Sequence, residues 1–137
     1  LRPLDEVGLS YIKLGQSSSS LSGGESQRVK LAYFLSRENS EKNRLFIFDE
    51  PTTGLHVFDI EKLLKSFRAL IKNGHSVLVV EHNMDVVKCA DWIIDLGPDA
   101  GQNGGTCCFS GTPRALAQRT DLPTGQALHS KIFHDSL

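Results

Sequence analysis

The sequence predicts an α/β fold: part of a nucleotide-binding domain with a mainly parallel sheet, crossover helices and an edge strand near the C-terminus. Short apolar runs at Leu45–Phe48 and Val77–Val80 fit buried strands. Between them, apolar residues recur at helical spacing from Ile60 to Ile71, and Gly74 provides a stop. A strand, a helix and a strand in this order form a crossover unit, whose strands are parallel.

The residues before the first strand predict two helices. A short helical pattern covers Pro3–Leu14, and the serine-rich segment Gln16–Ser20 reads as a loop. A longer helix is expected from Ser22 to about Arg37, because Ser22 and Glu25 have the spacing of a capping box. Residues 39–43 are polar and predict a turn.

The second half of the chain predicts the remaining elements. The second strand extends over Ser76–Glu81, a helix over about Met84–Cys89, and a third strand over Asp91–Leu96. The glycine-rich segment 97–105 predicts a loop or a hairpin connection, residues 106–110 an edge strand, and Thr112-Pro113 the start of a last helix. A polar tail is expected from about Asp121. No repeat or boundary divides the sequence, so residues 1–137 are expected to form one domain.

The composition excludes some classes of protein and partner. Hydrophobic residues make up 39% of the chain and charged residues 23%, which is ordinary for a globular protein. The formal net charge of −1 gives no overall electrostatic attraction for nucleic acid. The apolar runs are far too short for a membrane span, and no secretory pattern opens the chain, so no membrane partner and a cytoplasmic location are expected.

Three segments carry candidate chemistry. In Leu21–Arg28, two glycines precede a helix, where backbone amides and the helix dipole favour an anion; a plain capped helix start is the alternative. Asp49 and Glu50 end the first strand, the edge where open α/β sheets place ligands, although acids leaving a sheet for solvent also fit. His82 ends the second strand and fits a phosphate contact or an ordinary surface histidine.

Taken together and in this order, the segments resemble the ATP-binding-cassette ATPase family. Leu21–Glu25 is similar to its signature loop, Leu45–Glu50 to its Walker B strand and His82 to its switch histidine. The resemblance implies that Asp49 holds Mg²⁺ through water. It implies that the catalytic residue Glu50 is the general base or positions the attacking water, and that His82 contacts the γ-phosphate. It also implies an ATP-binding signature loop formed by Ser22, Gly23, Gly24 and Glu25, which closes over ATP held by another half.

Within that family, the chain most resembles the UvrA branch, the damage-recognition ATPases of the bacterial excinuclease. The segments that carry this finer resemblance are Glu50–His56, Glu81–Val87 and Ala90–Pro98. The resemblance implies damage recognition in bacterial nucleotide excision repair. The partners that it implies are a homodimer partner, damaged DNA and the helicase subunit of the excinuclease. A transporter's nucleotide-binding domain and a non-catalytic interaction module are the alternatives.

One expected motif does not occur in the sequence. No glycine is followed by Lys-Ser or Lys-Thr, so the chain contains no Walker A loop to seat the β- and γ-phosphates of ATP. Zinc is expected in the parent family, but this sequence lacks the cysteine pairs that the zinc modules of that family need. Because the first residue is Leu1 and not Met, we expect a piece of a longer protein, and the resemblance implies its C-terminal part. It would need the N-terminal portion of that protein to complete its ATP sites and would be inactive alone.

Overall fold

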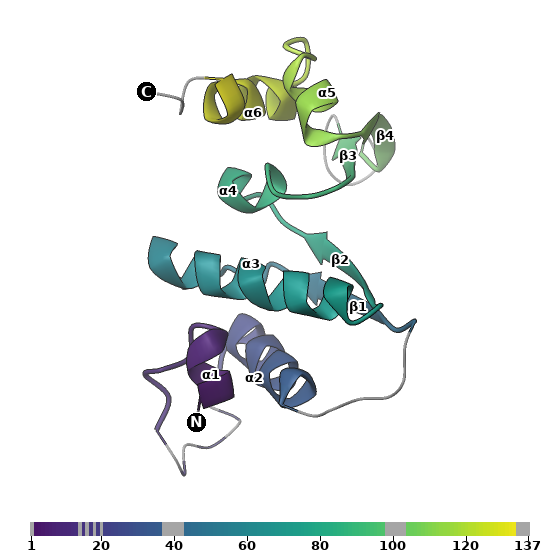
Figure 1. The fold of residues 1–137 in the computed structure, drawn as a ribbon. Coiled ribbons are helices and arrows are strands. Elements are labelled where there is room, and N and C mark those ends of the chain that lie inside the picture. Colours follow the sequence, from purple (N-terminus) through teal and green to yellow (C-terminus); the bar gives the residue numbers. More distant parts are fainter. Residues whose placement is uncertain are drawn as a thin grey trace. The chain divides into compact units, whose positions relative to one another are not determined.

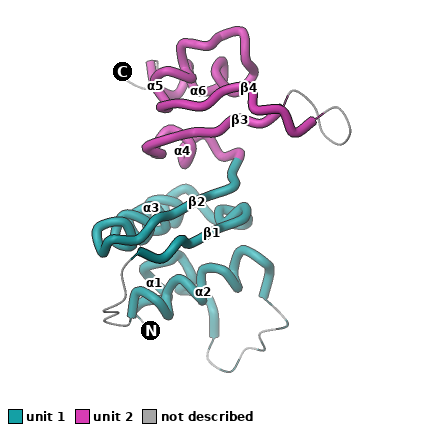
Figure 2. Tube along the Cα trace, turned by 90° about the vertical axis from the view of Figure 1, so that its right-hand side faces the viewer, with its two compact units in different colours: residues 1–81 teal, residues 82–137 magenta. Residues whose placement is uncertain are grey.

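The computed structural model describes residues 2–13, 15, 17, 19, 21–36, 43–97 and 104–133. The chain divides into two compact units, residues 1–81 and residues 82–137, and each is described by itself (Figure 2). No helix in the described ranges is long and apolar enough to cross a membrane.

Unit 1 contains a parallel strand pair joined by a helix (Figure 1). Strand β1 (Leu45–Asp49) pairs in parallel with β2 (Ser76–Val80), with Leu45 opposite Ser76 and Asp49 opposite Val80. Helix α3 (Val57–Lys72) makes the crossover between them. The predicted strand–helix–strand unit is therefore confirmed.

Two further helices precede this unit, and the first is shorter than predicted. Helix α1 spans Arg2–Glu6 and ends before Gly8, whose φ of +73° lies in the left-handed region that terminates helices. A side chain at Gly8 would also lie only 2.8 Å from Cβ of Asp59. Helix α2 spans Gly23–Leu35, so its start agrees with the capping-box prediction. Arg37, residues 39–42 of the predicted turn, and Gln16, Ser18 and Ser20 lie outside the described residues.

The core of unit 1 lies between α3, α2, α1 and one face of the strand pair. Helix α3 buries a stripe at helical spacing, which includes Leu63, Phe67 and Leu70. Phe67 packs against Phe48 of β1 with ring centroids 4.8 Å apart. The core residues are Val7, Leu9, Leu31, Ala32, Phe48, Leu63, Phe67 and Leu70.

The opposite face of the strand pair is exposed. Leu45, Ile47, Leu78 and Val80 all lie on it, and Ile47 is 64% exposed. The prediction of fully buried strands is therefore wrong for this chain. Side chains alternate between the faces of a strand, and the helices of unit 1 cover only one of them.

Unit 2 contains an antiparallel pair and three helices. Strand β3 (Ile93–Gly97) pairs with β4 (Thr106–Gly111), with an irregular register between Asp95 and Leu96. The order strand, helix, strand, helix, strand predicted a parallel sheet that includes this third strand, but in the described part of the chain β3 pairs antiparallel with β4. The short connection between the strands permits only antiparallel pairing, because a parallel crossover needs about a dozen residues or more. Residues 98–103 of the predicted loop lie outside the described residues.

The helices of unit 2 are α4 (Met84–Val87), α5 (Pro113–Ala117) and α6 (Pro123–Phe133). The polar tail predicted from Asp121 is wrong from Pro123 to Phe133, where the chain is helical. Leu128 of α6 is fully buried against Leu116 and Ala117 of α5, and this contact gives the segment a core despite its polar composition.

Gly125 allows α6 to approach the end of α5, and its replacement by alanine is expected to destabilise unit 2. An added Cβ would lie 2.1 Å from the carbonyl oxygen of Arg119 and 2.6 Å from that of Leu116. Alanine improves helix propensity by about 1 kcal/mol, but relieving this overlap requires backbone movement. We expect Gly125→Ala to lower the free energy of unfolding by about 1–3 kcal/mol in urea denaturation. The exposed Ser130→Ala is the control in the same helix, and equal effects of the two changes would contradict the prediction.

Candidate functional site

The two candidate acids lie where β1 ends. Asp49 is the last residue of the strand, and the amide of Glu50 extends the ladder by donating to the carbonyl of Val80 at 2.9 Å. Both acids are exposed. Glu50 has a φ of +45°, a left-handed conformation that is rare for residues other than glycine. Such a conformation costs on the order of 1–3 kcal/mol and persists only where the surroundings enforce it.

A tight turn follows Glu50. The amide of Thr53 donates to the carbonyl of Glu50 at 3.1 Å, and the amide of Leu55 donates to the carbonyl of Thr52 at 2.9 Å. Gly54 takes a φ of +76° to complete the reversal into α3. We call residues 49–53 the acid turn.

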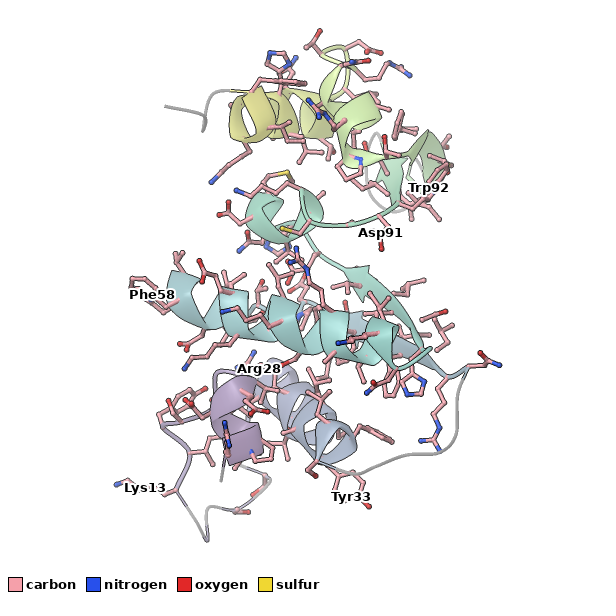
Figure 3. All side chains as sticks on the ribbon, viewed as in Figure 1. Lys13, Arg28, Tyr33, Phe58, Asp91 and Trp92 are labelled. Carbon is pink, nitrogen blue, oxygen red and sulfur yellow. The ribbon has the colours of Figure 1, made fainter. Side chains whose placement is uncertain are left out.

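Two adjacent side chains of helix α2 form hydrogen bonds with the backbone of the acid turn. Gln27 donates through Nε2 to the carbonyl of Asp49 at 3.0 Å and accepts from the Asp49 amide at 3.1 Å. Its amide therefore occupies the edge of β1 as a neighbouring strand would. Arg28, labelled in Figure 3, is fully buried and donates through Nη1 to the carbonyls of Pro51 and Thr53.

Close packing around Arg28 explains why a glycine occupies position 24. A Cβ on Gly24 would lie 3.2 Å from Nη1 of Arg28 and 3.6 Å from the carbonyl oxygen of Glu50. Nε and Nη2 of Arg28 are buried with no hydrogen-bond partner in the described part of the chain. The bonds from Nη1 hold the guanidinium against the acid turn, since a buried donor without a partner costs free energy and stabilises nothing. By contrast, a Cβ on Gly23 would meet open space.

The predicted signature loop forms the capped start of α2. The Ser22 hydroxyl accepts from the Glu25 amide at 3.3 Å, and the Glu25 carboxylate accepts from the Ser22 amide through Oε2 at 2.7 Å. Its Oε1 accepts from the hydroxyl of Tyr11, a residue that the sequence did not single out. Both Glu25 oxygens are thus engaged within the chain, which assigns this carboxylate to shaping the loop.

The contact between Tyr11 and Glu25 also changes how both groups titrate. The hydrogen bond from Tyr11, followed by the bonds from Ser22, holds the pKa of Glu25 below its ordinary value. Partial burial raises the pKa of Tyr11, and the hydrogen bond to Glu25 adds to the effect. Glu25 therefore remains an anion and Tyr11 a neutral donor throughout the neutral range, which keeps the loop contact intact.

A further acid, Glu81, holds the acid turn from the side of β2. Its Oε1 accepts from the Thr52 amide at 3.0 Å and from the Thr52 hydroxyl. The acid turn is therefore fixed by α2 on one side and by the residue after β2 on the other. The contact was not predicted, because nothing in the local pattern pairs residues 29 positions apart.

Curated bacterial proteins are similar to the chain along nearly its whole length. The UvrABC system protein A of Clostridium acetobutylicum is 54% identical over 132 residues, which cover 96% of this chain and 14% of that protein. The protein of the same name from Aquifex aeolicus is 49% identical over 137 residues, which cover 100% of this chain and 15% of that protein. The chain belongs to the UvrABC system protein A family. It spans about one seventh of the length of these relatives.

Solved structures agree with this placement. UvrA2 from Deinococcus radiodurans matches with a TM-score of 0.82 and 44% identity over 94% of this chain and 16% of that one. A bacterial Atm1-family ABC exporter with ATP bound matches with a TM-score of 0.61 and 20% identity over 96% of this chain and 23% of that one, which shows a shared fold alone. No protein-family model matches the chain. The predicted α/β fold of a partial ATP-binding-cassette domain is confirmed.

The remaining predicted residue is His82. It is exposed and follows β2, and the next residue, Asn83, caps α4 by accepting from the Asp85 amide at 2.9 Å. Glu50 lies in unit 1 and His82 in unit 2. Their convergence on one phosphate therefore stays a prediction.

The acid turn presents the kind of ligands that magnesium uses. No group of three or more His, Cys, Asp or Glu side chains that could hold a metal occurs among the described residues. Mg²⁺ needs no such group, because it is commonly bound by one or two carboxylates together with waters and substrate phosphates. Asp49 and Glu50 provide two exposed carboxylates at the end of β1.

Proposed function

We propose that this chain supplies the signature loop and the acid turn of composite ATP sites in the DNA damage-recognition ATPase of bacterial nucleotide excision repair. The observation that carries the proposal is the direct contact between the two elements: Gln27 and Arg28 of the signature helix hold the backbone of the acid turn. Family membership supports the activity and the repair process.

Each predicted residue then has a chemical role. The Glu50 carboxylate orients a water and accepts its proton, and the His82 imidazole donates a hydrogen bond to the γ-phosphate. Asp49 would hold Mg²⁺ through water, and the ion would supply positive charge to the phosphate oxygens. Ser22 and Gly23, which are both exposed at the start of α2, meet the phosphates of an ATP bound elsewhere. Glu25 shapes that loop.

The partners follow from the family and from the incomplete ATP site. The Walker A loop comes from another portion of the same protein, and the signature loop acts on a site shared with a homodimer partner. Damaged DNA and the helicase subunit of the excinuclease are the macromolecular partners, and the cytoplasm is the location. A transporter role is not favoured, because the exporter likeness concerns the fold alone.

ATP hydrolysis tests the proposal by comparing the isolated chain with a full-length protein that carries it. We expect Mg²⁺-dependent hydrolysis from the full-length protein and none above buffer from the isolated chain, because no loop of this chain seats the β- and γ-phosphates. Turnover by the isolated chain that Glu50→Gln abolishes would contradict the composite site. A full-length protein without ATPase activity would contradict the function itself.

A further inference from the structure

Thr52 and Glu81 form a contact between the acid turn and the residue that follows β2. Two donors of Thr52, its amide and its hydroxyl, converge on a single carboxylate oxygen of Glu81. Both residues are partly buried. Hydrogen bonds to a carboxylate are about twice as strong as neutral ones, and partial burial limits competition from water.

The position of this contact connects it to Glu50. Thr52 lies two residues after Glu50 in a turn closed by the bond from the Thr53 amide to the Glu50 carbonyl. Glu50 takes its left-handed conformation at the start of that turn. Gln27 and Arg28 restrain the turn from α2 through its backbone carbonyls. Glu81 restrains it from the side of β2 and through its donors.

We infer that Glu81 is a positioning residue for ATP hydrolysis: its carboxylate holds Thr52, and thereby keeps the Glu50 backbone in the strained conformation that aims the Glu50 carboxylate. The inference rests on the proposed function. Since a strained residue relaxes when its restraints are removed, loss of the Glu81 contact lets the turn leave this conformation while the other residues that bind ATP stay in place. The effect is therefore on kcat and not on the KM for ATP.

Substitutions at Glu81 in the full-length protein test this inference through steady-state ATP hydrolysis. Glu81→Met removes the acceptor at similar size, and we expect kcat to fall about 10-fold or more with the KM for ATP within about twofold. Glu81→Gln keeps an acceptor oxygen and is expected to retain kcat within about threefold. Glu61→Met, on the exposed surface of α3, is the matched control and is expected to behave as wild type.

Substitutions at Thr52 test the same contact from its other end. Thr52→Val removes the hydroxyl while keeping the shape of the side chain and is expected to lower kcat. Thr52→Ser keeps the hydroxyl donor and is expected to retain the wild-type kcat. The double variant Glu81→Met/Thr52→Val is expected to be no slower than Glu81→Met alone, because both changes break one interaction. If Glu81→Met fails to fold, Thr52→Val against Thr52→Ser decides.

Two results overturn the inference, and they differ from those that overturn the proposed function. Wild-type kcat in both Glu81→Met and Thr52→Val would remove Glu81 from its role, as would a raised KM with kcat unchanged. These results count only where the wild type hydrolyses ATP and Glu50→Gln does not. Absence of wild-type hydrolysis, or full activity in Glu50→Gln, sinks the proposed function instead.

Discussion

Replacing Glu50 by Gln in the full-length protein is expected to lower kcat for ATP hydrolysis by roughly 10²–10⁴-fold while ATP still binds. The amide has the size of the carboxylate but cannot accept a proton from water at neutral pH. Backbone strain at this position is the same for both side chains, since both place a Cβ at a φ of +45°. The loss is therefore chemical and not conformational.

Two measurements separate these effects. Equilibrium binding of ATP is expected to stay near wild type, and single-turnover hydrolysis is expected to show the full loss. Glu61→Gln on α3 is the matched control, because it makes the same chemical change at an exposed position in the same unit. Hydrolysis by Glu50→Gln at the wild-type rate would withdraw the role given to Glu50.

Leu63→Ala is expected to have the largest effect on the stability of unit 1, a loss of about 2–5 kcal/mol in the free energy of unfolding. Leu63 is fully buried in the middle of α3, in the core that also contains Leu31, Phe48 and Phe67. Removing its side chain loses apolar burial and leaves a cavity in the layer that supports β1. The acid turn follows that strand directly.

Ile71→Ala is the matched control, because Ile71 lies on the same helix with a side chain that is 45% exposed. Its loss is expected to be well below that of Leu63→Ala, and urea denaturation followed by circular dichroism measures both. Equal losses would mean that the described core does not carry the stability of this unit.

Local patterns predicted much of the fold. The capping box at Ser22 and Glu25 located the start of α2, and the apolar stripe on α3 gave its position between two strands. The prediction of a polar tail was wrong from Pro123, because the core contact of this segment depends on Gly125 and Leu128 packing against another helix. The prediction that both strands are fully buried was also wrong, since a sequence pattern does not show which face of a sheet other elements cover.

The site was predicted in its acids and loop but not in the contacts that hold them. Asp49 and Glu50 stand out as carboxylates at a strand end, which is a local signal. The roles of Gln27, Arg28 and Glu81 arise from bonds to backbone and side-chain groups more than 20 positions away. Nor does a glutamate give any sign that its own backbone will be left-handed.

The acid turn and the residues that hold it are far apart in the sequence, and this separation affects how the turn forms during synthesis on the ribosome. The turn cannot be held by β2 until Val80 and Glu81 have emerged, and Glu81 comes 29 positions after Thr52. At the usual pace of translation this delay is on the order of seconds, which is ample time for α3 to form first. In a nascent chain arrested shortly after α3, the backbone of Glu50 would be relaxed. Glu50 would take its left-handed conformation only after β2 and Glu81 had emerged from the ribosome.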